Sequence, residues 1–435
     1  MLDELKSAAR RMGSDYALRS LMTDCRRLLS ERGEANSVVI ARSLVARFDS
    51  LPAEQQATFF ERLATEFSPD PKAVLDSALA YAEQPSADNL IRLTREAEPP
   101  RQELLRRINR TPGGTSSIVR MRRTLLERLP KQPALRALEA DLLHLLSSWF
   151  NPGFLEMRKV DWNSPAQLLE KLIRHEAVHE IDGWDDLRRR LLPDRRCFAF
   201  FHPQLPDEPL IFVEVALVPE MPAAVAPLID KTSSAAGPDT YKVATFYSIS
   251  NCQPGLKGVS LGNFLIKRVA EELKREVPQL KTFCTLSPIP GFAGWLAKDG
   301  DWTALPGTKK AVAERALQAR AVLKAACGGE WSRLASAAAL QALPADAQQA
   351  LERLCAFYLV HQTPHPGGDP VARFHLDNGA RLERLNPMGN LSRPGLKQSF
   401  GLMVNYLYDL SRVEAHHEGF TQGEIATARA VTSLL

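Results

Sequence analysis

The periodicity of the apolar residues changes near residue 150, and this change constrains the fold more than any other feature of the sequence. Before that point apolar residues recur at the spacing of amphipathic helices. The stretch 15–32, for example, carries such a stripe: Leu18, Leu21, Met22, Cys25, Leu28 and Leu29. After residues 149–153, Trp-Phe-Asn-Pro-Gly, short β-rich runs alternate with helical ones. The sequence predicts an α+β multidomain protein, with an all-α helical bundle over 1–150 and a mixed α/β domain over 151–435.

The second part is predicted to contain a mixed β-sheet. Its expected strands are rich in β-branched and aromatic residues and lie at 196–203, 210–219, 243–250 and 281–286. The first two are joined by a polar turn and are typical of an antiparallel pair. The last two are separated by a loop and a helix over 259–278, which makes a strand–loop–helix–strand unit.

Two further elements are expected near the C-terminal end of the chain. An Ala-rich helical insertion interrupts the sheet region at about 308–361. Residues 371–386 are then predicted to form a β-hairpin, with Asp377-Asn378-Gly379 supplying the turn. In such a strand Arg373 and His375 would face one side of the sheet.

Composition narrows the class of protein. The chain has 435 residues, 45% hydrophobic and 24% charged, which is typical of a folded globular protein with two or three domains. Its longest apolar runs are shorter than the roughly 20 residues of a membrane-spanning helix. The net charge of +4 is small and dispersed, so it favours a small anionic ligand over nucleic acid. Six scattered cysteines form no CxxC pair and are expected to be reduced thiols.

The N-terminal residues carry no recognisable targeting segment. They lack the apolar core of a signal peptide, and Asp3, Glu4 and Asp15 are unlike an acid-poor transit peptide. We therefore expect a cytoplasmic protein.

Residues 175–179 match H-E-x-x-H, the signature of zinc metalloproteases. That site needs both histidines on one face of a helix, with a third ligand further along the chain. Here residues 181–184 end the helix directly after His179, and no third ligand is evident. We interpret the motif as a helix end with two partly exposed histidines, and we predict no metal site.

The loop at 253–262, QPGLKGVSLG, lies between a strand and a long helix. Glycines at this position let the backbone approach a ligand, and the helix N-terminus favours a phosphate group. The spacing is neither that of G-x-G-x-x-G nor that of a P-loop. It resembles the Q-x-x-G-x-G pyrophosphate loop of the GNAT acyl-CoA-binding superfamily. Taken alone, its glycines are equally compatible with turns and close packing.

Two other residues are candidates for chemistry. Ser287 stands in LSPIPGF, where Pro288 and Pro290 stiffen the backbone and hold the hydroxyl in place. On composition alone an ordinary strand-to-turn serine explains it as well, and no G-x-S-x-G elbow is present. His375 stands in ARFHLDNGA, and nothing in the spacing pairs it with Ser287.

Several long motifs, in order, resemble the malonyl-CoA decarboxylase family. They are FYSIS (246–250), QPGLKGVSLGNFLIKRVAEELKREVPQL (253–280), TLSPIPGF (285–292), VARFHLDNGA (371–380) and GLMVNYLYDL (401–410). The segment EAVHEIDGWDDLRRRL with RRCFAFFHP also fits the family. In that family the EAVH segment is not a zinc site. The resemblance covers the whole second half and implies a GNAT-like catalytic domain after a helical oligomerisation domain.

The resemblance assigns site residues one by one. The family's catalytic pair falls on Ser287 and His375. Its substrate-binding run falls on Lys257, Gly258, Val259, Ser260, Leu261, Gly262 and Asn263, with Ser248 near the acyl group. Relatives can carry a glutamate at the position of Ser260. This chain has no carboxylate there, so whether the reaction needs one at this position is open.

The implied reaction converts malonyl-CoA and a proton to acetyl-CoA and carbon dioxide through a thioester enolate. Ser287 would engage the malonyl carboxylate, and His375 would protonate the enolate carbon. No metal or organic cofactor is expected, because the thioester itself accepts the electrons. The family also implies a homo-oligomer, a tetramer, with no nucleic-acid or membrane partner. The alternatives are a GNAT-type acyltransferase, an acyl-CoA sensor without turnover and, last, a zinc hydrolase.

Overall fold

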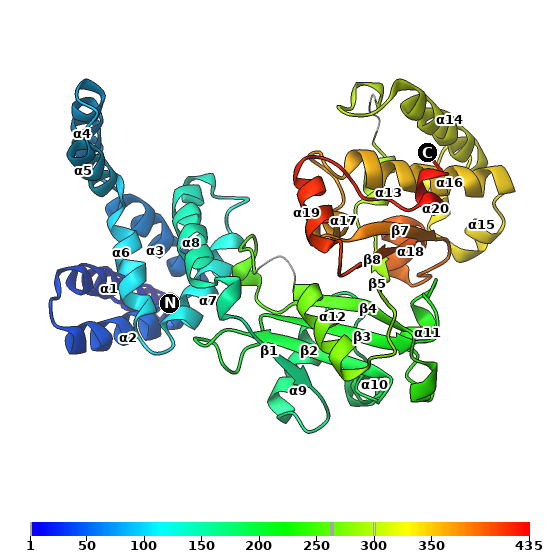
Figure 1. Cartoon of the computed structure of the whole chain (residues 1–435). Helices are drawn as coiled ribbons and strands as arrows, with labels where there is room; N and C mark the ends of the chain where they lie inside the picture. The colour runs from blue at the N-terminus through cyan, green and yellow to red at the C-terminus, as the bar shows by residue number, and fades with distance from the viewer. Residues whose placement is uncertain (1, 262–264, 299, 301) are drawn as a thin grey trace. The chain divides into compact units, whose positions relative to one another are not determined.

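The computed structural model describes residues 2–261, 265–298, 300 and 302–435 (Figure 1). These residues divide into two compact units. The first contains the chain up to Glu156 together with two later segments, Phe201–Pro209 and Gln253–Leu261. The second contains the rest. The loop that follows the third large strand therefore packs with the N-terminal helices, although it belongs by sequence to the second half.

The first unit is built from helices, as the sequence predicted. They are α1 (Leu2–Ser30), α2 (Glu34–Ser50), α3 (Ala53–Glu66), α4 (Pro71–Glu83), α5 (Ala87–Ala97), α6 (Pro100–Asn109), α7 (Gly114–Leu126) and α8 (Arg136–Trp149). Local signals set their starts: the Asp70 side chain accepts from Lys72 N before α4, and Ser86 accepts from Asn89 N before α5. Phe48, Phe59 and Phe60 pack with ring centroids 5.3–5.9 Å apart in the core.

The second unit is organised around a mixed sheet. Its strands are β1 (Glu156–Val160), β2 (Arg195–Phe201), β3 (Ile211–Val218), β4 (Val243–Asn251), β5 (Thr282–Thr285), β6 (Ser287–Pro288), β7 (Arg381–Asn386) and β8 (Met403–Leu407). The order is β1-β2-β3-β4-β5-β8-β6, and β7 also pairs with β8. β2 and β3 are antiparallel, with Arg195 opposite Ala216, and β4 and β5 are parallel, with Val243 opposite Thr282. The predicted antiparallel pair is confirmed, and the two strands of the predicted strand–loop–helix–strand unit lie side by side.

Helices cover this sheet and extend beyond it. They are α9 (Ala166–His175), α10 (Gly183–Arg190), α11 (Ala226–Ile229), α12 (Leu265–Glu276), α13 (Phe292–Leu296), α14 (Lys310–Ala326), α15 (Ala337–Gln341), α16 (Ala345–Phe357), α17 (Pro370–Asp377), α18 (Arg393–Ser399), α19 (Val413–Thr421) and α20 (Arg429–Thr432). α12 lies over the strands in Figure 1, with the Arg268 guanidinium 5.5 Å from the Phe200 ring centroid. The region predicted to be Ala-rich and helical contains α14, α15 and α16.

The predicted hairpin at 371–386 is wrong in its first half. Residues 370–377 form helix α17, and only Arg381–Asn386 is a strand. The reason lies just before the helix: Asp369 accepts hydrogen bonds from Val371 N and Ala372 N, and Pro370 occupies the first helical turn. Gly379, at φ +76°, then turns the chain into β7. His375 is therefore a helix residue, and the strand alternation expected for it does not apply.

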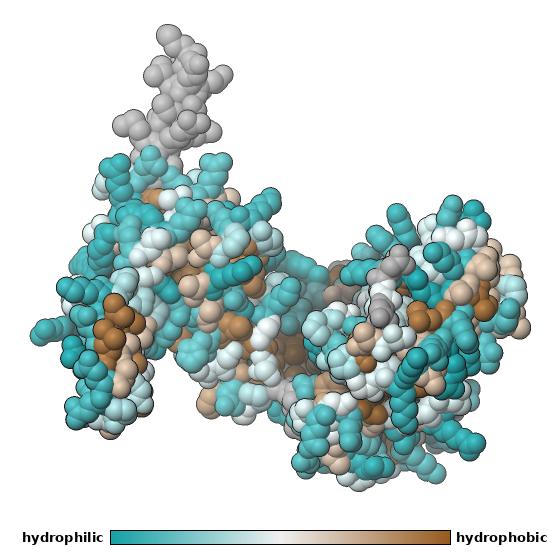
Figure 2. All heavy atoms as spheres, turned by 90° about the horizontal axis from the view of Figure 1, so that it is seen from above, coloured by the Kyte–Doolittle hydropathy of each residue, from teal (hydrophilic) through white to brown (hydrophobic). Residues whose placement is uncertain are grey.

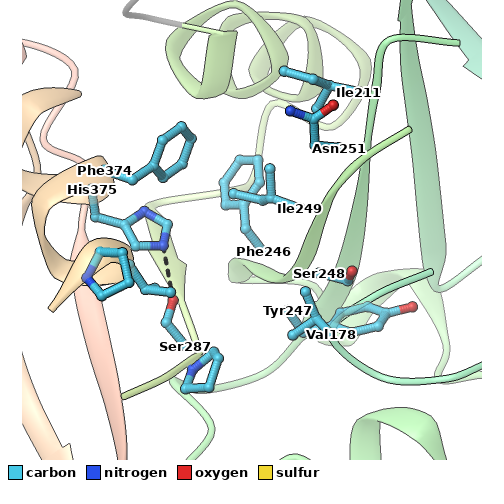
Figure 3. Close-up of a pocket in the computed structure, with 13 residues that line it drawn as sticks. Val178, Ile211, Phe246, Tyr247, Ser248, Ile249, Asn251, Ser287, Phe374 and His375 are labelled. Atoms are coloured by element: carbon cyan, nitrogen blue, oxygen red, sulfur yellow. Dashed lines mark hydrogen bonds between the residues drawn. The ribbon is translucent and has the colours of Figure 1, made fainter. Parts of the chain in front are cut away.

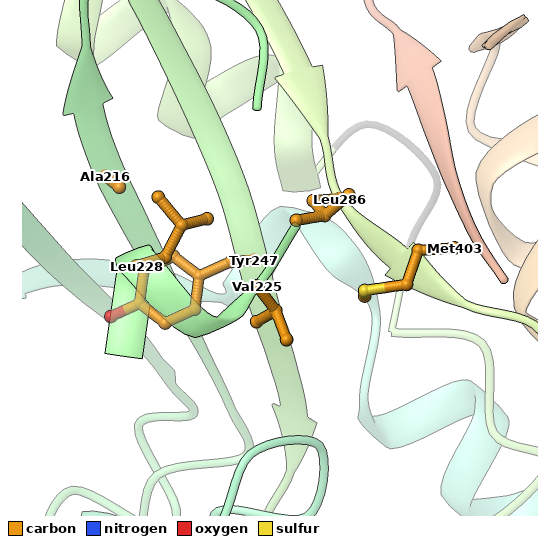
Figure 4. Close-up of a cluster of buried hydrophobic side chains, with 6 residues drawn as sticks. All are labelled: Ala216, Val225, Leu228, Tyr247, Leu286 and Met403. Atoms are coloured by element: carbon orange, nitrogen blue, oxygen red, sulfur yellow. The ribbon is translucent and has the colours of Figure 1, made fainter. Parts of the chain in front are cut away.

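A small apolar cluster supports the strands that carry the candidate site. It contains Ala216, Val225, Leu228, Tyr247, Leu286 and Met403 (Figure 4). Tyr247 adjoins Ser248 on β4, and Leu286 adjoins Ser287. Burying these side chains fixes the backbone from which both serines project. None of the described helices combines the length and the apolar character that crossing a lipid bilayer requires.

Candidate active site

Both residues predicted to be catalytic line one pocket of the second unit (Figure 3). The cavity measures about 280 Å³. Its walls are Val178, Ile211, Phe246, Tyr247, Ser248, Ile249, Asn251, Ser287, Pro288, Pro370, Val371, Phe374 and His375. None of these described lining residues is a lysine, arginine, aspartate or glutamate. The pocket is thus mainly apolar, with a few hydroxyl, amide and imidazole groups.

Ser287 and His375 form a hydrogen-bonded pair in this pocket. Ser287 Oγ lies 3.0 Å from His375 Nε2, although 88 positions separate the residues. Ser287 comes from β6 and His375 from the last turn of α17, and both are buried. The Ser287 hydroxyl donates to Thr285 Oγ1 at 2.8 Å. Tyr406 N donates to the same Thr285 oxygen at 3.2 Å.

The surroundings of His375 set its protonation state and tautomer. Burial lowers the pKa of His375 from 6.5 to about 3, so the imidazole is neutral near pH 7. A neutral imidazole carries one N–H group. The Ser287 hydroxyl donates to Thr285, so we infer that the N–H is on Nε2. Nδ1 then accepts from the Tyr408 hydroxyl, whose oxygen is 2.9 Å away. The Tyr406 ring stacks on the imidazole, with centroids 4.7 Å apart.

Asp369 connects the two segments that carry the pair. Its Oδ1 caps α17, the helix of His375, and its Oδ2 accepts from Gly291 N at 2.9 Å. Gly291 lies four positions after Ser287, in the turn that follows β6. The carboxylate is fully buried, and burial raises the pKa of Asp369 while the three N–H groups lower it. One side chain thus holds both segments.

Ser248 lies across the pocket from the pair and contacts a buried carboxylate (Figure 3). Its hydroxyl oxygen is 2.7 Å from each carboxylate oxygen of Glu176. Glu176 also accepts from Val178 N, from His179 N and from the Ser250 hydroxyl. A buried carboxylate with several donors is satisfied in place. Ser248 is therefore held towards Glu176.

The H-E-x-x-H motif does not form the face that zinc proteases use. α9 ends at His175, so His175 and His179 do not share a helix. Glu176 contacts serine hydroxyls and backbone N–H groups instead. Among the described residues, no cluster of three or more His, Cys, Asp or Glu side chains is arranged to hold a metal ion. The expected exposure was wrong for His179, which is buried, and burial lowers its pKa to about 4.

The predicted substrate-binding loop belongs to the first unit. Lys257, Gly258 and Ser260 are exposed, whereas Val259 and Leu261 are buried. Gly258 has φ +81°, a conformation that glycine adopts readily. The remaining two predicted positions, Gly262 and Asn263, lie outside the described residues.

Sequence reasoning missed four residues of the site: Thr285, Tyr408, Asp369 and Glu176. Tyr408 was present in the motif GLMVNYLYDL but carried no signal of its own. Asp369 could have been found, because Asp-Pro before an apolar stretch is a helix-start signal. The bond between Glu176 and Ser248 joins residues 72 positions apart, and no local pattern predicts it.

The chain is similar to known proteins over nearly its whole length. The model of the malonyl-CoA decarboxylase C-terminal domain matches residues 153–435, and that of the N-terminal domain matches 67–150. The mitochondrial malonyl-CoA decarboxylase of Mus musculus is 37% identical over 385 residues, which cover 82% of this chain and 77% of the relative. That of Anser anser anser is 38% identical, and the match covers 72% of this chain but only 64% of the relative.

Solved structures agree with these matches. The crystal structure of malonyl-CoA decarboxylase from Rhodopseudomonas palustris is 46% identical, with a TM-score of 0.85 over 96% of this chain and 99% of that one. The structure from Agrobacterium vitis is 45% identical, with a TM-score of 0.81 over 95% of this chain and 99% of that one. By sequence and by fold, this chain belongs to the malonyl-CoA decarboxylase family.

Proposed function

We propose that the chain decarboxylates malonyl-CoA to acetyl-CoA and carbon dioxide, with Ser287 and His375 as the catalytic pair. The observation that carries this proposal is the 3.0 Å contact between Ser287 Oγ and His375 Nε2 in an apolar pocket. Membership of the malonyl-CoA decarboxylase family supports the same reaction. No observation favours the acyltransferase alternative.

The composition of the pocket suits the loss of carbon dioxide. When the bond to the carboxylate breaks, its electron pair moves into the thioester and leaves an enolate. An apolar wall without cations stabilises a bound carboxylate less than water does. This environment destabilises neutral carbon dioxide and a delocalised enolate less than it destabilises the carboxylate. The thioester is the electron sink, so the proposal requires no metal or organic cofactor.

The hydrogen-bond network supports separate roles for the pair. Ser287 would hold the malonyl carboxylate by a hydrogen bond from its hydroxyl, and this carboxylate, already ionised near pH 7, would leave as carbon dioxide. His375 Nε2–H would protonate the enolate carbon, a general-acid contribution of roughly 10²–10⁴-fold. A neutral imidazole is a weak acid on its own. As the Nε2 proton leaves, Nδ1 would take the proton of Tyr408, whose hydroxyl is 2.9 Å away. A proton from solvent restores the network after the product leaves.

Substrate contacts are proposed for Ser248 and for the run Lys257, Gly258, Val259, Ser260, Leu261, Gly262 and Asn263. The run would bind the CoA moiety through its backbone. The N–H groups of Gly258, Ser260 and Leu261 have no hydrogen-bond partner within the described part of the chain. Ser260 brings no carboxylate to this loop, so any carboxylate in the reaction would come from elsewhere. We propose Glu176 as the candidate for such a carboxylate, because it contacts Ser248, which lines the pocket.

Incubation of the purified protein with malonyl-CoA alone, followed by mass spectrometry, tests the proposal. We expect acetyl-CoA without any acceptor and with EDTA present. Ser287→Ala and His375→Asn should each abolish most turnover, whereas His144→Asn, at an exposed helix position, should not. Intact malonyl-CoA in every sample would refute the proposed function. Full activity of His375→Asn would refute the assignment of the proton donor.

We also propose that the protein is cytoplasmic and that it self-associates. The apolar surface of two helices supports self-association. Helices α4 and α5 pack on each other and leave large apolar side chains exposed. These are Leu75, Leu79, Leu90 and Ile91, with exposed fractions of 58%, 53%, 46% and 57%. Apolar patches on the helical region are visible at the left of Figure 2. Exposed clusters of this kind are typical of protein interfaces. We propose that a homo-oligomer, a tetramer, covers them.

A further inference from the structure

A buried arginine of the helical unit holds the loop that is proposed to bind CoA. Arg122 lies on α7 and is 1% exposed. One terminal nitrogen donates to the carbonyl of Gly255 at 2.8 Å, and the other donates to that of Lys257 at 2.8 Å. The second nitrogen also contacts Glu139 on α8 at 2.7 Å. A single guanidinium therefore joins two helices to two backbone carbonyls of the loop.

The loop backbone lies directly against α7. A Cβ atom on Gly255 would stand only 2.0 Å from the carbonyl oxygen of Val119, so a larger residue would displace the loop. Leu256 and Val259 are buried on the same segment. The segment Gln253–Leu261 accordingly groups with the N-terminal helices in one compact unit. Its position depends on α7 and α8 as much as on the strand that precedes it.

This arrangement orients the polar groups of the loop. The carbonyls of Gly255 and Lys257 point to Arg122. The N–H groups of Gly258, Ser260 and Leu261 have no partner within the described part of the chain. Free backbone N–H groups of a glycine-containing loop are donors suited to phosphate oxygens. Arg122 thus occupies two carbonyls of the loop, whereas these three N–H groups remain available to a ligand.

We propose that Arg122 is a positioning residue for CoA: it fixes the loop in the conformation that binds the diphosphate of the substrate. This inference rests on the proposed function, and it gives the helical half a part in substrate binding besides self-association. Arg122 itself does not touch the substrate. It acts by removing alternative conformations of the loop, so that binding does not have to order the loop first.

The test compares substrates with and without the nucleotide. Malonyl-CoA carries the diphosphate, and malonyl-pantetheine lacks it but has the same reacting group. We expect Arg122→Ala to raise the KM for malonyl-CoA roughly tenfold or more, because two charged hydrogen bonds are lost. The kcat with malonyl-CoA and the kinetics with malonyl-pantetheine should stay close to those of the wild type. Arg123→Ala, on the same helix but exposed, is the matched control.

Gly255→Ala guards against a folding defect in Arg122→Ala. It keeps the guanidinium but forces the loop away from Val119, so it should show the same rise in KM. Thermal unfolding of each variant identifies those that fold. Equal losses with both thioesters, or an unchanged KM for malonyl-CoA in the folded variants, would overturn the inference.

Calorimetry with CoA and with pantetheine separates this inference from the proposed function. Arg122→Ala and Gly255→Ala should weaken the binding of CoA but not of pantetheine, whether or not the enzyme turns over. Ser287→Ala should bind CoA like the wild type while losing turnover of both thioesters. A wild-type protein that binds CoA but leaves both thioesters intact would contradict the decarboxylase proposal and would leave the binding result for Arg122 as the decisive test.

Discussion

Among single residues, His375 shows most clearly how burial sets a protonation state. The pKa of His375 falls from 6.5 to about 3, so the imidazole stays neutral across the range in which most histidines titrate. We therefore expect kcat to show no inflection attributable to His375 between roughly pH 5 and 8. A pH profile of kcat with malonyl-CoA measures this. An inflection near 6.5 that disappears in a His375 variant with residual activity would contradict the neutral assignment.

The same pKa makes stability depend on pH. The unfolded histidine binds a proton near pH 6.5, whereas the folded one does so only near 3. Stability from this group is fully present above 6.5 and is lost as the pH falls towards 3, by up to about 1.4 kcal/mol per pH unit. Urea unfolding at several pH values should show a steeper loss for the wild type than for His375→Asn. Parallel curves would disprove this contribution.

The Tyr408 hydroxyl is expected to contribute to kcat through its hydrogen bond to His375. Tyr408→Phe removes the group on His375 Nδ1 and should lower kcat roughly 10- to 100-fold, with a smaller effect on KM. Tyr406→Phe is a close control, since that ring also contacts His375 but its buried hydroxyl has no hydrogen-bond partner among the described residues. Steady-state kinetics of both variants decide the point. Equal rates for the two would remove Tyr408 from the network.

Among the secondary-structure elements, α17 and the turn after β6 are joined by one buried side chain, Asp369. Asp369→Ala removes the cap of α17 and the bond to Gly291 N, so the free energy of unfolding should fall by about 2–4 kcal/mol. Asp369→Asn keeps an oxygen for the cap but cannot serve both segments, and its loss should be smaller. Urea unfolding and kcat are the measurements. Wild-type stability in Asp369→Ala would show that the cap is dispensable.

The sequence predicted strands β2 to β5 of the sheet but not helix α17. β2, β3, β4 and β5 were found because their apolar, β-branched runs are dictated by burial in the sheet. The run 371–376 has a similar composition, and the turn residues after it suggested a hairpin. The Asp-Pro signal before it decided otherwise. Capping outweighs strand propensity here because it satisfies two backbone N–H groups at once.

The sequence pointed to Ser287 and His375 but not to the residues that contact them. The resemblance to a family singled out Ser287 and His375, and the fold places their polar atoms 3.0 Å apart. The contacts to Thr285, Tyr408 and Glu176 depend on how distant segments pack, which a single sequence does not encode in any local pattern. The H-E-x-x-H motif does not place its two histidines on one helix face, because the helix ends at His175.

At the scale of the whole molecule, the exposed leucines of α4 and α5 predict self-association. Replacing Leu75 and Leu79 together with lysine should shift the protein towards smaller species, because charges cannot be buried in an apolar interface without a large cost. Sedimentation velocity measures the change. Glu83→Lys, exposed on the same hairpin, adds a charge without removing apolar surface and should have little effect. An unchanged mass for the double variant would exclude this face as the interface.

The placement of Gln253–Leu261 among the N-terminal helices has a consequence for how such a protein evolves. The change of pattern near residue 150 resembles a boundary at which recombination could exchange one module for another. An exchange at that point would remove Arg122 and Val119. The loop would then lose the hydrogen bonds to its two carbonyls and the close contact at Gly255. A protein with a different helical half would need new residues that hold the loop in the same way. We expect the two halves to descend together, with Arg122 and Gly255 both retained.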